Sequence, residues 1–219
     1  MSISIGKSLH IADVVRVATE IGEMGTAVRI GIDGPGASGK STLAAGLAEA
    51  LPEGVLVEGD DFYRPESDSS RSEIEIAGLF DIQRLASQVL IPHTKNRDLH
   101  YQRYDWESEA LGDWVNEPSG VPLIVEGVYS THEALRDFYD LRIWVTARRA
   151  VRLSRGMARD GEEARGRWVD VWMPAEDRYV AEQAPPDHAH LVLDGTGAIT
   201  RQGDEVSYMV AGGLLSQAP

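Results

Sequence analysis

The chain has 219 residues, of which 42% are apolar and 26% charged, and its net charge at pH 7 is −14. This composition indicates a soluble globular protein, and its acidity argues against binding to a nucleic-acid polymer. Cysteine is absent and no apolar run of about 18 residues occurs, so we expect neither disulfides nor membrane insertion, and a location in the reducing cytoplasm.

Five short apolar runs in the sequence are typical of β-strands. They are 28–33, 54–59, 122–127, 141–146 and 189–194. Helix-like stretches separate them, and this alternation predicts an α/β fold, with a five-stranded parallel sheet covered by helices on both faces. We expect a single domain spanning 1–219, in which 1–27 form an N-terminal helical extension.

A glycine-rich loop follows the first predicted strand. Its part from Gly34 to Ser41 matches G-x-x-x-x-G-K-[ST], with the preceding strand and following helix that this motif requires. Backbone N–H groups of such a loop bind phosphates, Lys40 adds a point charge, and the Ser41 hydroxyl can hold Mg²⁺. An ordinary tight turn is the alternative interpretation. The predicted nucleotide contacts are Gly34, Pro35, Gly36, Ala37, Ser38, Gly39, Lys40, Ser41 and Thr42.

Carboxylates follow the second and third predicted strands, in Glu58-Gly59-Asp60-Asp61 and in Glu126-Gly127. Because the carboxyl ends of parallel strands share one edge of a sheet, Asp60 and Glu126 could both reach a metal ion or an attacking hydroxyl. The alternative is that they cap helices or remain solvated. Asp61 is expected to be a bystander.

Two long segments interrupt the regular alternation. Residues 64–121 contain a polar stretch, a predicted helix from Ile82 to Leu90, and the aromatic patch HYQRYDW. In that patch, Tyr104 and Asp105 could line an acceptor pocket, or the aromatic rings could pack under a long loop. The second segment, 147–185, follows the fourth strand. Ligands of open α/β sheets bind where such segments can close over them.

Arginines are concentrated near the second of these segments. Nine of them lie between Arg142 and Arg178, where six acidic residues leave a local charge of +3. The spacing of Arg148, Arg152, Arg155 and Arg159 places these side chains along one face of a helix. That face could bind phosphates, or it could pair with acidic groups of the protein itself.

A helix start is predicted after the third strand. Ser130-Thr131-His132-Glu133 has the pattern of a capping box, in which a serine or threonine side chain bonds the first turn of a helix. The expected helix carries Leu135 and Phe138.

Five sequence segments together resemble the uridine kinase branch of P-loop kinases, which is also similar to phosphoribulokinase and bacterial pantothenate kinase. The segments are GIDGPGASGKST, GDDFYRP, YDW, PLIVEGVYS and RLSRGMARD, and the similarity extends from about Val28 to Gly195. The resemblance implies a P-loop nucleoside triphosphate hydrolase fold, similar to nucleoside monophosphate kinases, with an arginine-rich lid at 147–185 and an acceptor side at 64–121. It implies transfer of the γ-phosphoryl group of ATP to a small-molecule hydroxyl, with Mg²⁺.

The resemblance also implies roles for individual residues. Asp60 matches the catalytic base, Tyr63 lies near the acceptor, and Glu126 helps to hold Mg²⁺ with Ser41 and Asp60. Arg155 and Arg159 match lid arginines that contact the phosphates. Uridine kinases typically carry a histidine five residues after the tyrosine of the Y-D-F element, where this chain has Glu109. This departure leaves the acceptor open, although uridine and cytidine are the first expectation; a glutamate could bind a sugar hydroxyl or an amine.

Two other functions share the phosphate loop. A GTP-dependent switch ordinarily carries N-K-x-D for guanine, which we do not find in this sequence. A nucleotide-binding regulator without phosphotransfer would use the lid and the aromatic segment to bind a partner. The sequence does not distinguish a monomer from a homo-oligomer.

Overall fold

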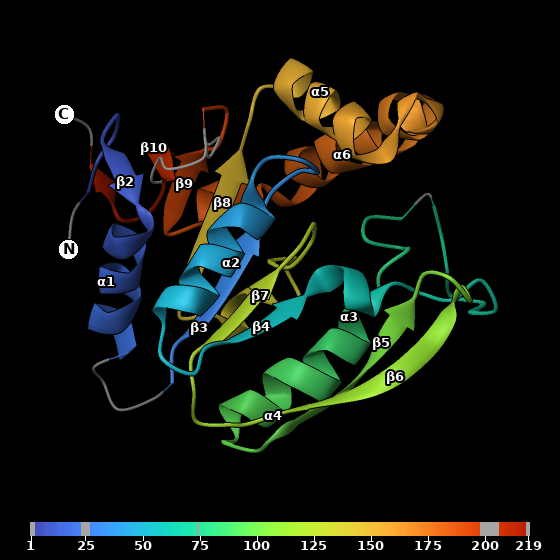
Figure 1. Cartoon of the computed structure of the whole chain (residues 1–219), viewed down its shortest axis with the longest axis horizontal. Helices are drawn as coiled ribbons and strands as arrows, with labels where there is room; N and C mark the ends of the chain where they lie inside the picture. The colour runs from blue at the N-terminus through green and yellow to red at the C-terminus, as the bar shows by residue number, and fades with distance from the viewer. Residues whose placement is uncertain (1–2, 23–26, 74, 198–205, 218–219) are drawn as a thin grey trace.

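The structure is a computed structural model that describes residues 3–22, 27–73, 75–197 and 206–217 (Figure 1). At its centre is a seven-stranded sheet in the order β2-β10-β9-β8-β3-β7-β4. Its strands are β2 (Ser8–His10), β3 (Arg29–Asp33), β4 (Val55–Glu58), β7 (Leu123–Glu126), β8 (Leu141–Thr146), β9 (Leu191–Asp194) and β10 (Ser207–Gly212). The strands from β9 to β4 pair in parallel, which confirms the five strands predicted from the sequence.

The sheet is wider than predicted, because two antiparallel strands extend it. β10 pairs with β9, and β2 pairs with β10. Val206, Tyr208 and Val210 are buried while the residues between them are less so, which is the period of two typical of a strand with one face in the core. The sequence prediction missed this alternation in the tail. A separate parallel pair joins β1 (Ile3–Ser4) to β11 (Ser216–Gln217).

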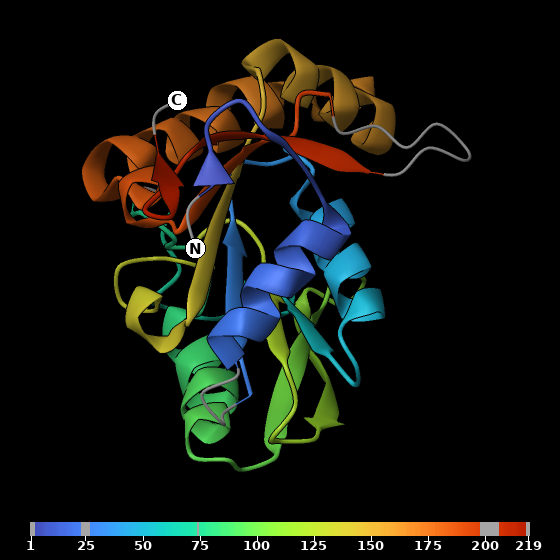
Figure 2. The ribbon, with the colours of Figure 1, turned by 90° about the vertical axis from the view of Figure 1, so that its left-hand side faces the viewer.

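Two helices cover one face of the sheet, as Figures 1 and 2 show. They are α1 (Ile11–Gly22) and α2 (Lys40–Ala50), which contact each other. Leu43 and Leu47 of α2 are fully buried in the same apolar cluster as Val14 and Val17 of α1. The N-terminal helix is therefore confirmed, while 1–2 and 23–26 of the predicted extension lie outside the described residues.

The segment after β4 begins with a 3-10 turn, η1 (Gly59–Phe62), and ends in a hairpin that the sequence prediction did not include. A helical stretch comes between them, and its parts are α3 (Ile82–Leu85), the π-helical η2 (Ala86–Leu90) and α4 (Ile91–Thr94). The predicted helix is thus confirmed and continues beyond Leu90. The hairpin consists of β5 (Leu99–Asp105) and β6 (Ala110–Glu117). Val89 and Leu99 pack with Val57 and Val125 on the second face of the sheet.

The capping-box prediction after β7 is wrong. This segment forms turns and one short 3-10 helix, η3 (Arg136–Phe138). The Ser130 hydroxyl donates to Ile32 O at 2.8 Å, and the Thr131 hydroxyl donates to Asp33 Oδ2 at 2.8 Å. Because both hydroxyls bond the buried end of β3, neither is available to cap a helix.

The arginine-rich segment after β8 is helical and lies over the carboxyl ends of the parallel strands (Figure 1). Its elements are α5 (Arg149–Asp160), η4 (Glu162–Ala164), the π-helical η5 (Arg167–Trp172), α6 (Met173–Gln183) and α7 (Pro185–His188). Within the described ranges, no helix has the length and apolar character needed to cross a membrane.

Candidate active site

The glycine loop connects β3 to α2 at the carboxyl edge of the sheet. Gly34 has a φ of 146°, and a Cβ there would lie only 2.0 Å from Val145 O of the neighbouring strand. Gly39, which precedes α2, has a φ of 106°. L-residues rarely adopt such angles, so the two glycines allow the loop to turn tightly between its strand and its helix. This is the local geometry that the motif predicted.

Asp33 fixes the start of this loop, and the sequence prediction missed it. The carboxylate is fully buried and accepts hydrogen bonds from Gly34 N, Tyr129 N, Thr131 and the Tyr179 hydroxyl, over 2.6 to 3.0 Å. Burial raises the pKa of Asp33, although these hydrogen bonds oppose the shift. One carboxylate thus joins the phosphate loop, the segment after β7, and α6. The only signal in the sequence was an acid directly before the first glycine.

Lys40 and Ser41 begin α2 and face the end of β7. Lys40 is buried, and its Nζ donates to Pro35 O at 3.2 Å. The Ser41 hydroxyl donates to Glu126 Oε1 at 3.0 Å, while Glu126 Oε2 is buried without a hydrogen-bond partner. Burial raises the pKa of Glu126, and the nearby Lys40 charge opposes that rise.

The chemistry of these groups fits a magnesium ion. A hydroxyl, a buried carboxylate with a free oxygen, and the neighbouring Asp60 offer oxygen ligands, which Mg²⁺ prefers. Among the described residues, no three Asp, Glu or His side chains form a dedicated metal cage. Mg²⁺ usually takes one or two carboxylates and completes its shell with water and substrate phosphates, so this set suits a nucleotide-linked ion.

Asp60 and Asp61 differ in their surroundings. The ends of β4 and β7 lie side by side, with Glu58 paired to Glu126, and Asp60 follows in η1 as an exposed side chain lining the main cavity. Asp61 instead forms an ion pair with Arg103 at 3.2 Å and does not line the cavity. The structure therefore brings Asp60 to the site and leaves its neighbour outside it.

One cavity of about 730 Å³ joins these groups to the segment after β4. Residues of the loop from Gly36 to Thr42, apart from Ser38, line one end, together with Asp60 and Glu126. Ser38 is itself buried, and Gly34 and Pro35 do not line the cavity. We call this end the donor end. The volume of the whole cavity is typical of a small-molecule site.

Aromatic side chains line the other end of the cavity, which we call the acceptor end. The Tyr63 ring lies 5.1 Å from that of Phe80, 5.4 Å from that of Tyr104 and 4.9 Å from that of Trp106, measured between centroids. Glu109 also lines this end. Asp105 does not: its carboxylate is exposed and accepts hydrogen bonds from Ser108 and Glu107 N in the hairpin turn. The predicted acceptor contact of Asp105 therefore has no support in this arrangement.

The four arginines predicted to share one helix face have different environments. Arg155 and Arg159 of α5 line the cavity. Arg155 donates to Ala37 O at 3.2 Å, and Arg159 pairs with Asp160 at 2.6 Å. Arg148 does not line the cavity, and Arg152 is buried in an ion pair with Glu176 at 2.7 Å. Pairing with acidic groups is thus confirmed for Arg152 and Arg159, while phosphate binding by the two cavity-lining arginines stays a prediction.

Glu176 also contacts the phosphate loop directly. Its Oε1 accepts a hydrogen bond from Gly36 N at 2.7 Å, while its Oε2 pairs with Arg152. A carboxylate of the arginine-rich segment therefore binds one backbone amide of the loop, and it connects α6 to the donor end. Nothing in the sequence pattern marked this residue.

Comparison with known proteins agrees with this geometry. Residues 29–193 match the family model described as the Phosphoribulokinase / Uridine kinase family. The Uridine kinase of Alkaliphilus metalliredigens (strain QYMF) is 32% identical over 154 residues, which cover 66% of this chain and 73% of that protein. The resemblance predicted from the five motifs is confirmed.

Solved structures show the same fold. One described as a possible uridine kinase from Bacillus stearothermophilus has a TM-score of 0.65 at 21% identity, and covers 83% of this chain and 96% of its own. A D-glycerate 3-kinase from Cryptococcus neoformans has a TM-score of 0.60 at 12% identity, over 95% of this chain and 93% of its own. The predicted P-loop kinase fold is confirmed, apart from the two additional strands.

Proposed function

Because this chain belongs to the phosphoribulokinase/uridine kinase family, and is a phosphotransferase that acts on a hydroxyl group, we propose that it transfers the γ-phosphoryl group of ATP to uridine or cytidine. The observation that carries this proposal is a shared cavity, in which Asp60 lies with the phosphate loop and with the aromatic acceptor end. The named uridine kinase relative supports a nucleoside acceptor.

At the donor end, the loop amides and Lys40 bind the β- and γ-phosphates, which are held at the N-terminus of α2. Ser41 and Glu126 are the residues that would hold Mg²⁺, with Asp60 beside them. When bound, this ion neutralises charge on the phosphate oxygens. Lys40 and Glu126 are already held in place by the hydrogen bonds and burial described above.

At the acceptor end, a pyrimidine ring stacks against Tyr63, Tyr104 and Trp106, because every nucleobase has a π-face that can stack on an aromatic ring. Glu109 accepts a hydrogen bond from a ribose hydroxyl. This assignment uses a position where the chain lacks the histidine typical of uridine kinases, and a glutamate there suits a sugar hydroxyl.

Transfer then requires one base and several positive charges. Asp60 takes the proton of the acceptor hydroxyl, whose oxygen forms the new bond to the γ-phosphorus while the bond to the bridging oxygen of ADP breaks. Arg155 and Arg159 stabilise the charge on the transferring oxygens. The helices of 147–185 act as a lid that excludes water, which limits hydrolysis of ATP.

A coupled ADP-release screen tests this proposal. ATP, Mg²⁺ and the full chain are mixed with uridine, cytidine, other nucleosides, sugars and vitamins. We expect the fastest ADP release with uridine or cytidine. ATP binding without turnover on any acceptor would instead indicate a nucleotide-binding regulator, and a titration that prefers GTP to ATP would indicate a switch. Turnover only on a sugar or vitamin would support the kinase activity and contradict the proposal of a nucleoside acceptor.

The absence of cysteine and the small-molecule chemistry favour the cytoplasm as the compartment in which the reaction takes place. We also propose that 1–219 act as one kinase domain.

A further inference from the structure

Arg84 is a buried cation behind the acceptor end that no part of the proposed chemistry uses. It belongs to α3, its side chain is 8% exposed, and it does not line the cavity. Burial lowers the pKa of its guanidinium, and the charges of Asp81 and Asp61 oppose the shift. A buried charge is costly unless its donors are satisfied, so its partners indicate what holds it in place.

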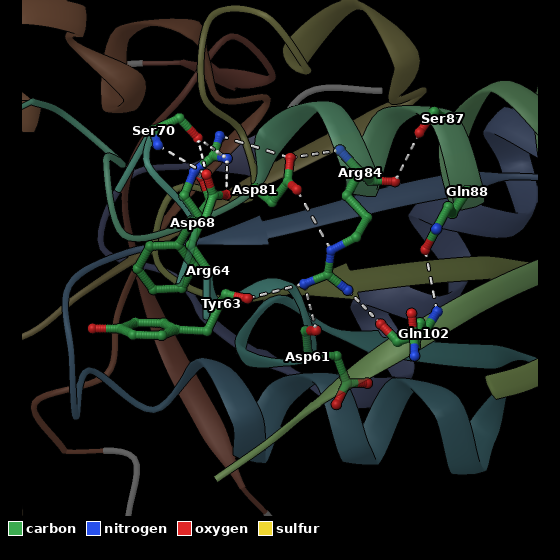
Figure 3. Close-up of polar contacts among 11 residues, drawn as sticks. Asp61, Tyr63, Arg64, Asp68, Ser70, Asp81, Arg84, Ser87, Gln88 and Gln102 are labelled. Carbon is green, nitrogen blue, oxygen red and sulfur yellow. Dashed lines mark hydrogen bonds and ion pairs between the residues drawn. The ribbon is translucent and has the colours of Figure 1, made fainter. Parts of the chain in front are cut away.

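The partners of Arg84 are mainly backbone carbonyls (Figure 3). Its Nη2 donates to Asp61 O at 3.1 Å and to Tyr63 O at 3.0 Å, and its Nη1 donates to Gln102 O. Its Nε lies 3.6 Å from Asp81 Oδ2. The guanidinium also stacks over the Phe62 ring, 4.8 Å from the centroid.

These partners come from three segments that together build the acceptor end. Asp61, Phe62 and Tyr63 immediately follow Asp60 in and after η1, Gln102 lies in β5 two residues before Tyr104, and Asp81 follows Phe80. In the sequence these segments are about 20 residues apart. They meet on one planar side chain, as Figure 3 shows for Asp61, Tyr63, Asp81 and Gln102.

We infer that Arg84 is a positioning residue for phosphoryl transfer: it sets the turn carrying Asp60 and Tyr63 against the strand carrying Tyr104. The inference rests on the proposed function of that end of the cavity. A guanidinium presents five N–H donors in a fixed plane, so it can bond several carbonyls at set angles, whereas an ammonium group offers donors from a single point. A misplacement of about 1 Å can cost on the order of 100-fold in rate.

The test compares Arg84→Lys and Arg84→Gln with Arg142→Gln. Arg142 is a matched control because it also bonds backbone carbonyls, donating to His188 O at 2.8 Å and Arg136 O at 3.2 Å, but at the start of β8. That end of the strand is opposite the phosphate loop. All three variants lose buried or half-buried hydrogen bonds, so all three should lower Tm.

With uridine as the acceptor, we expect Arg84→Gln to lower kcat roughly 100-fold and to raise the KM for uridine about tenfold. The affinity for ATP should stay within about twofold of the wild type. Arg84→Lys should fall between Arg84→Gln and the wild type, because it restores part of the hydrogen bonding. Arg142→Gln should leave kcat, the KM for uridine and the affinity for ATP unchanged despite its lower Tm.

Amide hydrogen exchange without any acceptor supplies a second, independent readout. In the Arg84 variants, exchange should accelerate in residues 58–64 and 99–105, while residues 34–42 keep the wild-type rate. If wild-type protein does not phosphorylate uridine, the acceptor proposal fails and this exchange pattern alone decides the role of Arg84. Unchanged exchange in both segments would overturn the inference, as would a loss of ATP affinity in Arg84→Lys equal to its loss of transfer.

Discussion

The two ends of the cavity are built in different ways. Most of the donor end comes from one stretch of chain, in which β3, the glycine loop and α2 follow each other within 29–50, and Asp60 and Glu126 complete it. The acceptor end collects Tyr63, which follows η1, Phe80, and side chains of the β5–β6 hairpin, while Arg84 bonds backbone carbonyls both near η1 and in β5. A phosphate site can therefore be recognised from a local motif, whereas an acceptor site depends on contacts between distant segments.

Loss of the donor-end cation should have the largest effect. We expect Lys40→Met to lower kcat about 1,000-fold and to weaken ATP binding, because it removes a preorganised positive charge from the phosphates. Lys7→Met is the matched control, since Lys7 lies in the other Gly-Lys-Ser triplet of the chain, at residues 6–8, and is exposed outside the cavity. Steady-state kinetics and an ATP titration measure both effects. Equal activity of the two variants would show that Lys40 has no role in ATP binding or phosphoryl transfer.

The base connects the two ends, and its loss should affect only transfer. Asp60→Asn should lower kcat roughly 100- to 1,000-fold while ATP affinity stays within about twofold, because an amide cannot take the proton of the hydroxyl. Asp61→Asn should change kcat much less, since Asp61 pairs with Arg103 outside the cavity. Should the Asp60 variant transfer phosphate at the normal rate, the assignment of the base is wrong.

Loss of an aromatic side chain at the acceptor end should weaken binding of the acceptor and leave ATP binding unchanged. Trp106→Ala is expected to raise the KM for uridine about tenfold, since stacking on one aromatic contributes on the order of 1–3 kcal/mol per base. Trp114→Ala is the control on the same hairpin, where Trp114 stacks on His100 at 4.3 Å and lies outside the cavity. Equal KM values for the two variants would argue against stacking at Trp106.

Lowering the pH should have the smallest effect, a loss of stability through His132, which follows the Thr131 that bonds Asp33. Burial lowers the pKa of His132, whose Nδ1 accepts a hydrogen bond from Ala134 N at 3.2 Å. As pH falls, the unfolded chain therefore protonates His132 before the folded chain does. The contribution of neutral His132 to the free energy of unfolding is complete above about pH 6.5 and declines as pH falls toward the lowered pKa. Chemical unfolding of wild type between pH 7 and 5.5 should show this decline. His132→Gln should flatten it more than His100→Gln; an identical slope in both variants would exclude His132 as the cause.

Sequence reasoning recovered the parts of this protein that depend on neighbours in the chain. The five parallel strands, the phosphate loop and the helices α1 and α5 have clear local patterns, and the structure confirms them. The proposed capping box failed because Thr131 bonds Asp33, which lies almost 100 residues earlier. A side-chain contact of that kind leaves no periodic signal.

The remaining site residues show the same limit. Glu176 bonds Gly36 across 140 residues, and Arg84 bonds carbonyls of two segments and pairs with the Asp81 carboxylate in a third. Neither residue belongs to a motif, and both were found only in the structure. Among the predicted acceptor residues, Tyr63, Tyr104 and Glu109 line the cavity while Asp105 does not, because the β5–β6 turn directs its carboxylate to Ser108.

A single-turnover experiment tests most directly whether the two ends act together. Excess enzyme is mixed with Mg²⁺, uridine or cytidine, and ATP labelled in its γ-phosphoryl group, and the label is followed by mass spectrometry. We expect the label on a nucleoside hydroxyl, in equal amount to the ADP formed. Label that stays on ATP, or that appears only as inorganic phosphate, would contradict the account.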